Sequence, residues 1–189
     1  MNCFISGWAF PPPPTAANSI DITKIVAEYK TIENIALNFD KIFPKEIKTL
    51  TTWSMSSIIA LGVIDKIQAK KIILYSPAFK FEAIEELKML RQNIIQNKDV
   101  ALKLFARKCG IPKDLINTSY YTTQELLAGL DFLENTEIKP PQVPPNTKVI
   151  VVYGENDKII SPDSSKFVAE KLGVKAVMIE NGEHFFQFN

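Results

Sequence analysis

The 189-residue sequence is 46% hydrophobic and 23% charged, which fits one folded domain with a sizeable core and excludes a disordered or fibrous chain. Its formal net charge of +1 excludes a whole-molecule bias toward nucleic acid or anionic lipid, so we expect neither a nucleic-acid nor a membrane partner. No signal-peptide pattern and no run of about 18 apolar residues occurs, which favours a cytoplasmic location.

The first half of the chain predicts strands and helices in alternation. A buried strand is expected over residues 2–6, ending at Gly7 and Trp8, and the prolines that follow forbid an immediate helix. The hydrophobic pattern next predicts a strand over 18–25, a helix over 29–43, a strand over 46–53 and a buried helix over 54–62. Strand, sharp turn and helix therefore meet at Ser54.

The second half predicts a helical insertion between core strands. A strand over 71–75 precedes a long amphipathic segment from 79 to 138, and a proline-rich linker at 140–145 returns the chain to the core. The remaining elements are a strand over 147–153, a helix over 162–172 and a strand over 176–179. We expect a first core part at 1–78, a helical cap insertion at 79–139 and a second core part at 140–189. The predicted fold class is α/β, with a mostly parallel sheet and helices on both faces.

The histidine and cysteine content limits the possible chemistry. The single histidine, His184, follows the last predicted strand, and by itself a loop histidine is more often inert than catalytic. Cys3 and Cys109 are far apart in the sequence and are expected to be free and buried, with a disulfide or a cysteine nucleophile as the alternative. No metal-ligand spacing and no glycine-rich phosphate loop is present, so we expect no metal and no cofactor.

Two further residues complete a catalytic set with His184. Ser54 stands at the strand-to-helix turn, where its hydroxyl would project above the sheet, although serine is also a favoured helix N-cap. Asp157 follows the strand that ends at residue 153 and would emerge at the same carboxyl edge, although an acid there is usually a solvated turn residue. The order Ser, Asp, His, each after a separate core strand, is typical of α/β hydrolases.

These residues imply acyl transfer through a serine nucleophile. His184 would take the proton of the Ser54 hydroxyl during attack, while Asp157 holds the other ring nitrogen. The tetrahedral intermediate needs two N–H donors, and we predict that the backbones of Met55 and Trp8 supply them.

With this set assembled, the chain resembles the α/β-hydrolase superfamily. Within it, the chain resembles the carboxylesterases that remove the methyl ester of pimeloyl-acyl carrier protein in biotin synthesis, including their short BioV-type branch. The residues that carry the resemblance are Trp53-Ser54-Met55, Gly7-Trp8, Gly154-x-x-Asp157 and Gly182-x-His184, and they span nearly the whole chain. The resemblance implies a serine carboxylesterase that acts on an acyl carrier protein.

The chain departs from this family in three respects. Thr52 and Ser56 stand where glycine is usual beside the nucleophile, which would distort the turn and lower its efficiency. The chain begins where the third strand of a full-length hydrolase would lie, and little sequence follows His184. We interpret this as a minimal core, with truncation as the alternative.

A basic segment lies within the predicted cap. Residues 88–113 carry seven Lys and Arg against one Asp. Lys103 and Arg107 share a helix face and, with Lys108, form the predicted docking surface for acyl carrier protein and its phosphate. A solvated helix face is the alternative. The residues expected to face the core are Val100, Ala101, Leu104 and Phe105, and candidates for an acyl channel are Leu104, Phe105 and Leu127.

The leading hypothesis is hydrolysis of an acyl methyl ester on a carrier protein through an acyl-Ser54 intermediate. A generic esterase or thioesterase that needs no carrier is the nearest alternative. A catalytically silent hydrolase fold that serves as a binding protein is another.

Overall fold

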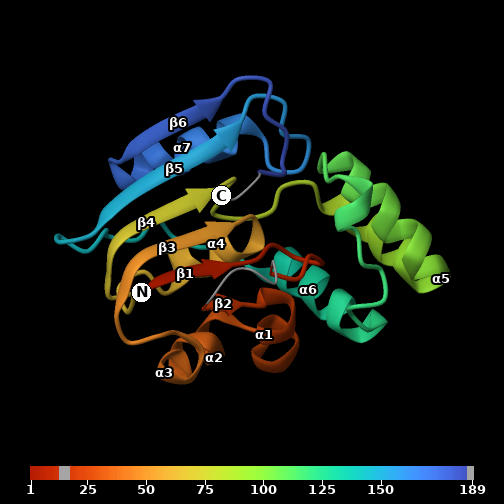
Figure 1. The fold of residues 1–189 in the computed structure, drawn as a ribbon, viewed down its shortest axis with the longest axis horizontal. Coiled ribbons are helices and arrows are strands. Elements are labelled where there is room, and N and C mark those ends of the chain that lie inside the picture. The colour runs from red at the N-terminus through yellow and green to blue at the C-terminus, as the bar shows by residue number, and fades with distance from the viewer. Residues whose placement is uncertain (13–17, 187–189) are drawn as a thin grey trace.

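A parallel sheet forms the centre of the molecule. The computed structural model describes residues 1–12 and 18–186, and in these residues six strands form one sheet of order β2-β1-β3-β4-β5-β6. The strands are β1 (Asn2–Ile5), β2 (Ser19–Ile20), β3 (Ile47–Trp53), β4 (Ala69–Tyr75), β5 (Lys148–Gly154) and β6 (Lys175–Ile179). Every adjacent pair is parallel, which confirms the predicted fold class (Figure 1).

Helices separate the strands along the chain. They are α1 (Ile22–Tyr29), α2 (Ile32–Leu37), α3 (Phe39–Ile42), α4 (Met55–Gly62), α5 (Ile84–Lys108), the 3-10 helix η1 (Lys113–Leu115), α6 (Thr123–Asn135) and α7 (Pro162–Leu172). The predicted strand over 18–25 is wrong beyond Ile20, because the Asp21 carboxylate accepts the N–H of Lys24 and starts α1. The predicted helix over 29–43 is two short helices, since Lys30 has a φ of 66° and ends α1 and the Thr31 hydroxyl caps α2.

Two apolar clusters lie on opposite faces of the sheet. Leu50 and Val151 belong to the larger cluster, which also receives residues of α1, α4, α6 and α7. Val152, whose side chain points to the other face, belongs to a smaller cluster with Ala106 and Cys109 from the end of α5. Helices thus contribute apolar contacts to both faces. Cys109 and Cys3 are free and buried, as expected.

The segment between β4 and β5 contains α5, η1 and α6. It is closed at its base, where the Ile138 N–H donates to the Phe79 carbonyl (2.7 Å) and the backbones of Lys80 and Glu137 form an isolated antiparallel β-bridge. Figure 1 shows α5 beyond the carboxyl ends of the strands. The expectation of continuous helix is wrong, because irregular backbone separates the helices and α5 itself is interrupted at Asn97 (φ −156°, ψ 90°).

The α5 helix differs from the prediction in the direction of its apolar residues. Ala101 is buried and Phe105 is half-buried, but Val100 and Leu104 are 50% and 53% exposed. In an α-helix, residues four apart share a face, so Val100 and Leu104 lie together on the side away from the core. No helix in the described part of the chain is both long and apolar enough to cross a membrane.

Candidate active site

Ser54 lies at the tip of the turn between β3 and α4. Its backbone has φ 60° and ψ −121°, a conformation that residues with a side chain rarely adopt. This geometry is typical of a strained turn that pushes a serine hydroxyl above a sheet. The Ser54 side chain makes no capping hydrogen bond to α4, so its alternative role as a helix N-cap is not realised.

Thr52 and Ser56 fit into this turn without glycine. Both are fully buried. The Ser56 hydroxyl accepts the Trp53 N–H (2.8 Å) and lies 3.0 Å from the Ile5 carbonyl, while the Thr52 hydroxyl lies 2.9 Å from that of Ser57. The side chains therefore hold the turn through hydrogen bonds, which removes the reason to expect a distortion.

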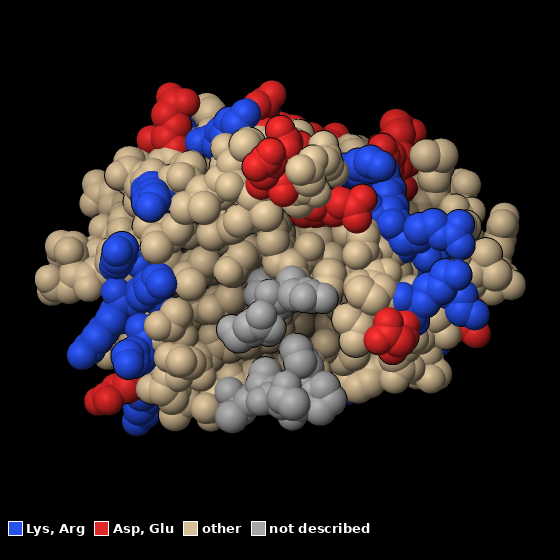
Figure 2. Space-filling model, turned by 45° about the horizontal axis from the view of Figure 1, so that its top comes forward, with Lys and Arg blue, Asp and Glu red and all other residues tan. Residues whose placement is uncertain are grey.

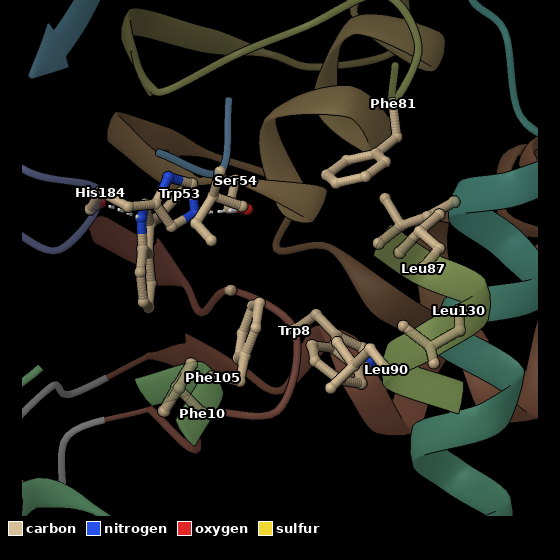
Figure 3. A pocket seen from close by; sticks show the side chains of 13 residues that line it. Trp8, Phe10, Trp53, Ser54, Phe81, Leu87, Leu90, Phe105, Leu130 and His184 are labelled. Atoms are coloured by element: carbon tan, nitrogen blue, oxygen red, sulfur yellow. Dashed lines mark hydrogen bonds between the residues drawn. The ribbon is translucent and has the colours of Figure 1, made fainter. Parts of the chain in front are cut away.

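His184 connects Ser54 to Asp157. Its Nε2 lies 2.9 Å from the Ser54 Oγ, and its Nδ1 lies 2.8 Å and 3.0 Å from the two Asp157 carboxylate oxygens. His184 and Asp157 are buried, and Figure 3 shows His184 and Ser54 side by side at one end of a pocket. The structure thus brings the three predicted side chains into one hydrogen-bond network.

The carboxylate of Asp157 has further donors that the sequence did not reveal. The Ser76 hydroxyl donates to Oδ2 (2.7 Å), and the backbone N–H groups of Ile159 and Ile160 donate to Oδ1 (2.8 and 3.0 Å). Burial by itself raises the pKa of Asp157, but His184 and these donors together hold that pKa below its ordinary value. Asp157 is therefore ionised at neutral pH and can accept a hydrogen bond from the Nδ1–H of His184.

The backbone of His184 is fixed by Trp53, the residue before the candidate nucleophile. The Trp53 indole N–H donates to the His184 carbonyl (2.8 Å). On the other side, the N–H of Phe185 donates to the carbonyl of Cys109 at the end of α5 (2.9 Å). No local pattern predicts either contact, because the partners lie far apart in the sequence.

The two predicted oxyanion donors border the same site. Met55 is the first residue of α4, and Trp8 follows β1 and lines the pocket together with Ser54 and His184. Among residues 1–12 and 18–186, no acceptor pairs with the backbone N–H of Met55 or of Trp8. Neither N–H is therefore used in a hydrogen bond within the described part of the chain.

An apolar pocket extends from Ser54 toward α5 and α6. Figure 3 shows Phe81, Leu87 and Leu130 across from the Ser54–His184 pair. The pocket itself has a volume of about 20 Å³, close to the space of one water molecule. A groove of about 320 Å³ adjoins it, and the lining residues common to both are Phe81, Leu87, Leu90, Phe105 and Ile159.

The groove opens along the two halves of α5. Leu104 and Phe105 line it, whereas Leu127 is not among the described residues that line either cavity. At its edge Lys108 forms an ion pair with Glu86. Among the described residues, no group of three or more His, Cys, Asp or Glu side chains is arranged so that it could hold a metal ion.

The basic residues of α5 differ in how far they are neutralised. Arg91 pairs with Asp131 and Glu134, and Lys88 pairs with Glu85. Lys103 and Arg107 are exposed and form no ion pair with any described residue. Figure 2 shows Lys and Arg gathered at both ends of one face of the molecule, with the group on the right lying over α5. Of the three residues predicted to dock a carrier protein, Lys108 is thus paired, and Lys103 and Arg107 have no ion-pair partner among the described residues.

The fold is the α/β-hydrolase fold. No family model matches the sequence, and no curated protein matches it. Among solved structures, the esterase EaEST from Exiguobacterium antarcticum superposes with a TM-score of 0.73 at 13% identity, over 97% of this chain and 85% of that one. The hydrolase olei00960 from Oleispira antarctica gives a TM-score of 0.72 at 13% identity, over 96% and 83% of the two chains. A bromoperoxidase from Bacillus anthracis gives 0.65 at 11% identity, over 97% and 85%. At such identities, these similarities establish the fold alone.

Proposed function

We propose that this protein is a serine carboxylesterase with Ser54 as nucleophile, His184 as general base and Asp157 as the residue that orients the imidazole. The observation that carries the proposal is the Ser54–His184–Asp157 hydrogen-bond network, with Ser54 on a strained turn beside an apolar pocket. The esterase EaEST, which has the same fold, supports it.

The reaction follows from this arrangement. The Ser54 oxygen attacks the ester carbonyl while its proton passes to His184 Nε2, and the N–H groups of Trp8 and Met55 stabilise the resulting oxyanion. His184 then gives the proton to the leaving alkoxide, which departs as an alcohol and leaves an acyl-Ser54 ester. Water, deprotonated by His184, then attacks the acyl carbon, and His184 returns the proton to the Ser54 oxygen as the free acid departs.

The substrate we propose is the methyl ester of pimeloyl-acyl carrier protein, as in the short BioV-type branch of biotin-synthesis esterases, with methanol as the leaving group. Three features support it. The pocket at Ser54 is small and apolar, the adjoining groove has room for a longer apolar chain, and Lys103 and Arg107 are exposed near the groove for an acidic carrier. In this proposal residues 79–139 act as the cap that binds the substrate.

The first experiment measures methanol release from pimeloyl-acyl carrier protein methyl ester by the purified protein. Release should disappear in Ser54→Ala, with a loss of several orders of magnitude in kcat. Ser54-dependent labelling by a fluorophosphonate provides an independent readout of the nucleophile. Absence of both release and labelling would instead favour a catalytically silent binding protein.

The carrier is tested by charge removal on α5. Lys103→Ala combined with Arg107→Ala should raise KM for the carrier-linked ester and leave turnover of the free methyl ester unchanged, because the free ester carries no acidic protein. A matched control is Lys70→Ala with Lys148→Ala, which removes two exposed charges near the amino ends of β4 and β5. Equal turnover of carrier-linked and free ester by the unaltered protein would leave a generic esterase.

A further inference from the structure

We propose that α6 positions the oxyanion side of the active site, and that Trp8 and Gly129 are the positioning residues through which it acts. The proposal rests on the proposed function, because it takes the backbone N–H of Trp8 as an oxyanion donor. It assigns the helices between β4 and β5 a part in transition-state stabilisation, in addition to covering the substrate.

The indole of Trp8 is buried between the two long helices of this segment. Its Nε1–H donates to the carbonyl of Leu126 in α6 (3.1 Å). Its ring packs edge-to-face against Phe105 of α5, with ring centroids 5.1 Å apart and an interplanar angle of 78°. Trp8 lines the same pocket as Ser54, His184 and Leu90 of α5 (Figure 3).

Gly129 provides the space that Trp8 occupies. A Cβ atom at residue 129 would lie 2.2 Å from Cδ1 and 2.4 Å from Nε1 of the Trp8 indole, distances at which the ring must move. Glycine in a helix interior is less favourable than alanine. The close approach of Trp8 is therefore a physical reason for glycine at this position of α6.

The loop that carries the Trp8 N–H depends on such external contacts. The next residue, Ala9, has a φ of 64°, which an alanine adopts only when surrounding contacts hold it. The Ala9 N–H donates to the Thr23 hydroxyl of α1 (3.0 Å). The loop is thus held by α1 through Thr23 and by α6 through Leu126 and Gly129, and the Trp8 N–H lies between these attachments.

The test compares Gly129→Ala and Trp8→Phe on a small methyl ester. Either change keeps every catalytic group but should shift the Trp8 N–H, so we expect kcat to fall about 10-fold to 100-fold with little change in KM. Combining the two should cost less than the product of the single effects, because the smaller ring of Phe relieves the contact with residue 129. Ala128→Gly, which weakens the same helix at a neighbouring residue, should retain kcat.

A second readout separates positioning from loss of structure. An alkyl boronic acid adds to Ser54 as a tetrahedral anion that needs the oxyanion donors, whereas an unreactive amide analogue binds without that charge. Gly129→Ala should weaken boronate binding by about the factor lost in kcat and leave amide binding unchanged. Equal weakening of both ligands, an unchanged kcat, or strictly multiplicative effects would overturn the inference. If instead the unaltered protein shows no Ser54-dependent hydrolysis, it is the proposed function that fails.

Discussion

At the scale of single residues, the site depends on side chains that hold the catalytic candidates in place. The Ser76 hydroxyl donates to the Asp157 carboxylate, and the Trp53 indole N–H donates to the His184 carbonyl. Neither residue was among the predicted catalytic and oxyanion residues. Hydrogen bonds to an ionised group are stronger than those between neutral groups. The buried Asp157 carboxylate is therefore stable as a charge only because several donors surround it.

The lowered pKa of Asp157 predicts a contribution to acid stability. Because this pKa lies lower in the folded than in the unfolded chain, the carboxylate stabilises the fold fully above its ordinary value of 3.8 and loses that effect as the pH falls through the lower folded value. Between about pH 6 and about pH 3, the free energy of unfolding should fall less steeply in Asp157→Asn than in the unaltered protein. Urea denaturation measures this, and the exposed Asp65→Asn serves as a control. Identical slopes in all three proteins would contradict the assignment.

Both thiols should be unreactive in the folded protein. Burial raises the pKa of Cys3 to about 11 and that of Cys109 well above its ordinary value. A thiolate is the reactive form, so a chromogenic disulfide reagent at neutral pH should detect no thiol until a denaturant unfolds the chain, after which both react. Rapid reaction of one thiol before unfolding would show that its environment is open to solvent.

At the scale of elements, the loops after β5 and β6 are joined and carry Asp157 and His184 together. The Asn156 N–H donates to the Gly182 carbonyl (2.7 Å), and the Glu155 N–H donates to the Ile179 carbonyl (3.0 Å). The contact is close because Gly154 has no side chain, so the backbone of the second loop passes directly over it. The distance between the acid and the base is therefore set by backbone packing.

Gly154→Ala should disrupt this packing. A Cβ atom there would lie 2.3 Å from the Glu183 carbonyl oxygen and 2.5 Å from that of Gly182. Both atoms belong to the backbone, which cannot shift without disturbing the loop. We expect a loss of about 2 kcal/mol or more in the free energy of unfolding, together with reduced kcat. In Gly173→Ala, by contrast, the new methyl group meets no atom within 4 Å and only a φ of 64° is strained, so about 1 kcal/mol is expected. Denaturant titration of both variants gives the two losses in the free energy of unfolding, one caused by steric overlap and the other by backbone strain.

At the scale of the whole molecule, the helices between β4 and β5 share one core with the sheet. The larger apolar cluster contains Leu87 and Ile94 of α5 and Leu126 and Leu130 of α6 together with sheet residues such as Leu50. Separate folding units are expected to have separate cores. The contacts of this cluster therefore favour folding of the two parts as one unit.

The protein should accordingly unfold in a single cooperative transition. Far-ultraviolet circular dichroism, which follows helices, and tryptophan fluorescence, which follows Trp8 and Trp53, should give coincident denaturation curves. The calorimetric and van't Hoff enthalpies should agree for the same reason. An early loss of helical signal at constant fluorescence would show that residues 79–139 unfold separately and would contradict a shared core.

The sequence by itself determined most of the strands and the positions of Ser54, Asp157 and His184 after three of them. Such features follow from local hydrophobic patterns and from the parallel sheet, which brings the carboxyl ends of its strands to one edge. The start of α1 was missed because a helix cap at Asp21 competes with an alternating apolar pattern that also fits a strand.

Tertiary structure alone decided which side chains support the site and which basic residues of α5 form ion pairs. The contact of Trp53 with His184, that of Trp8 with Leu126 and the pairing of Lys108 with Glu86 each join residues distant in sequence. The direction of α5 beyond its irregular residue Asn97 likewise exposes Leu104 instead of burying it. These outcomes depend on how separate elements pack against one another, and local periodicity specifies only which face of each element is apolar.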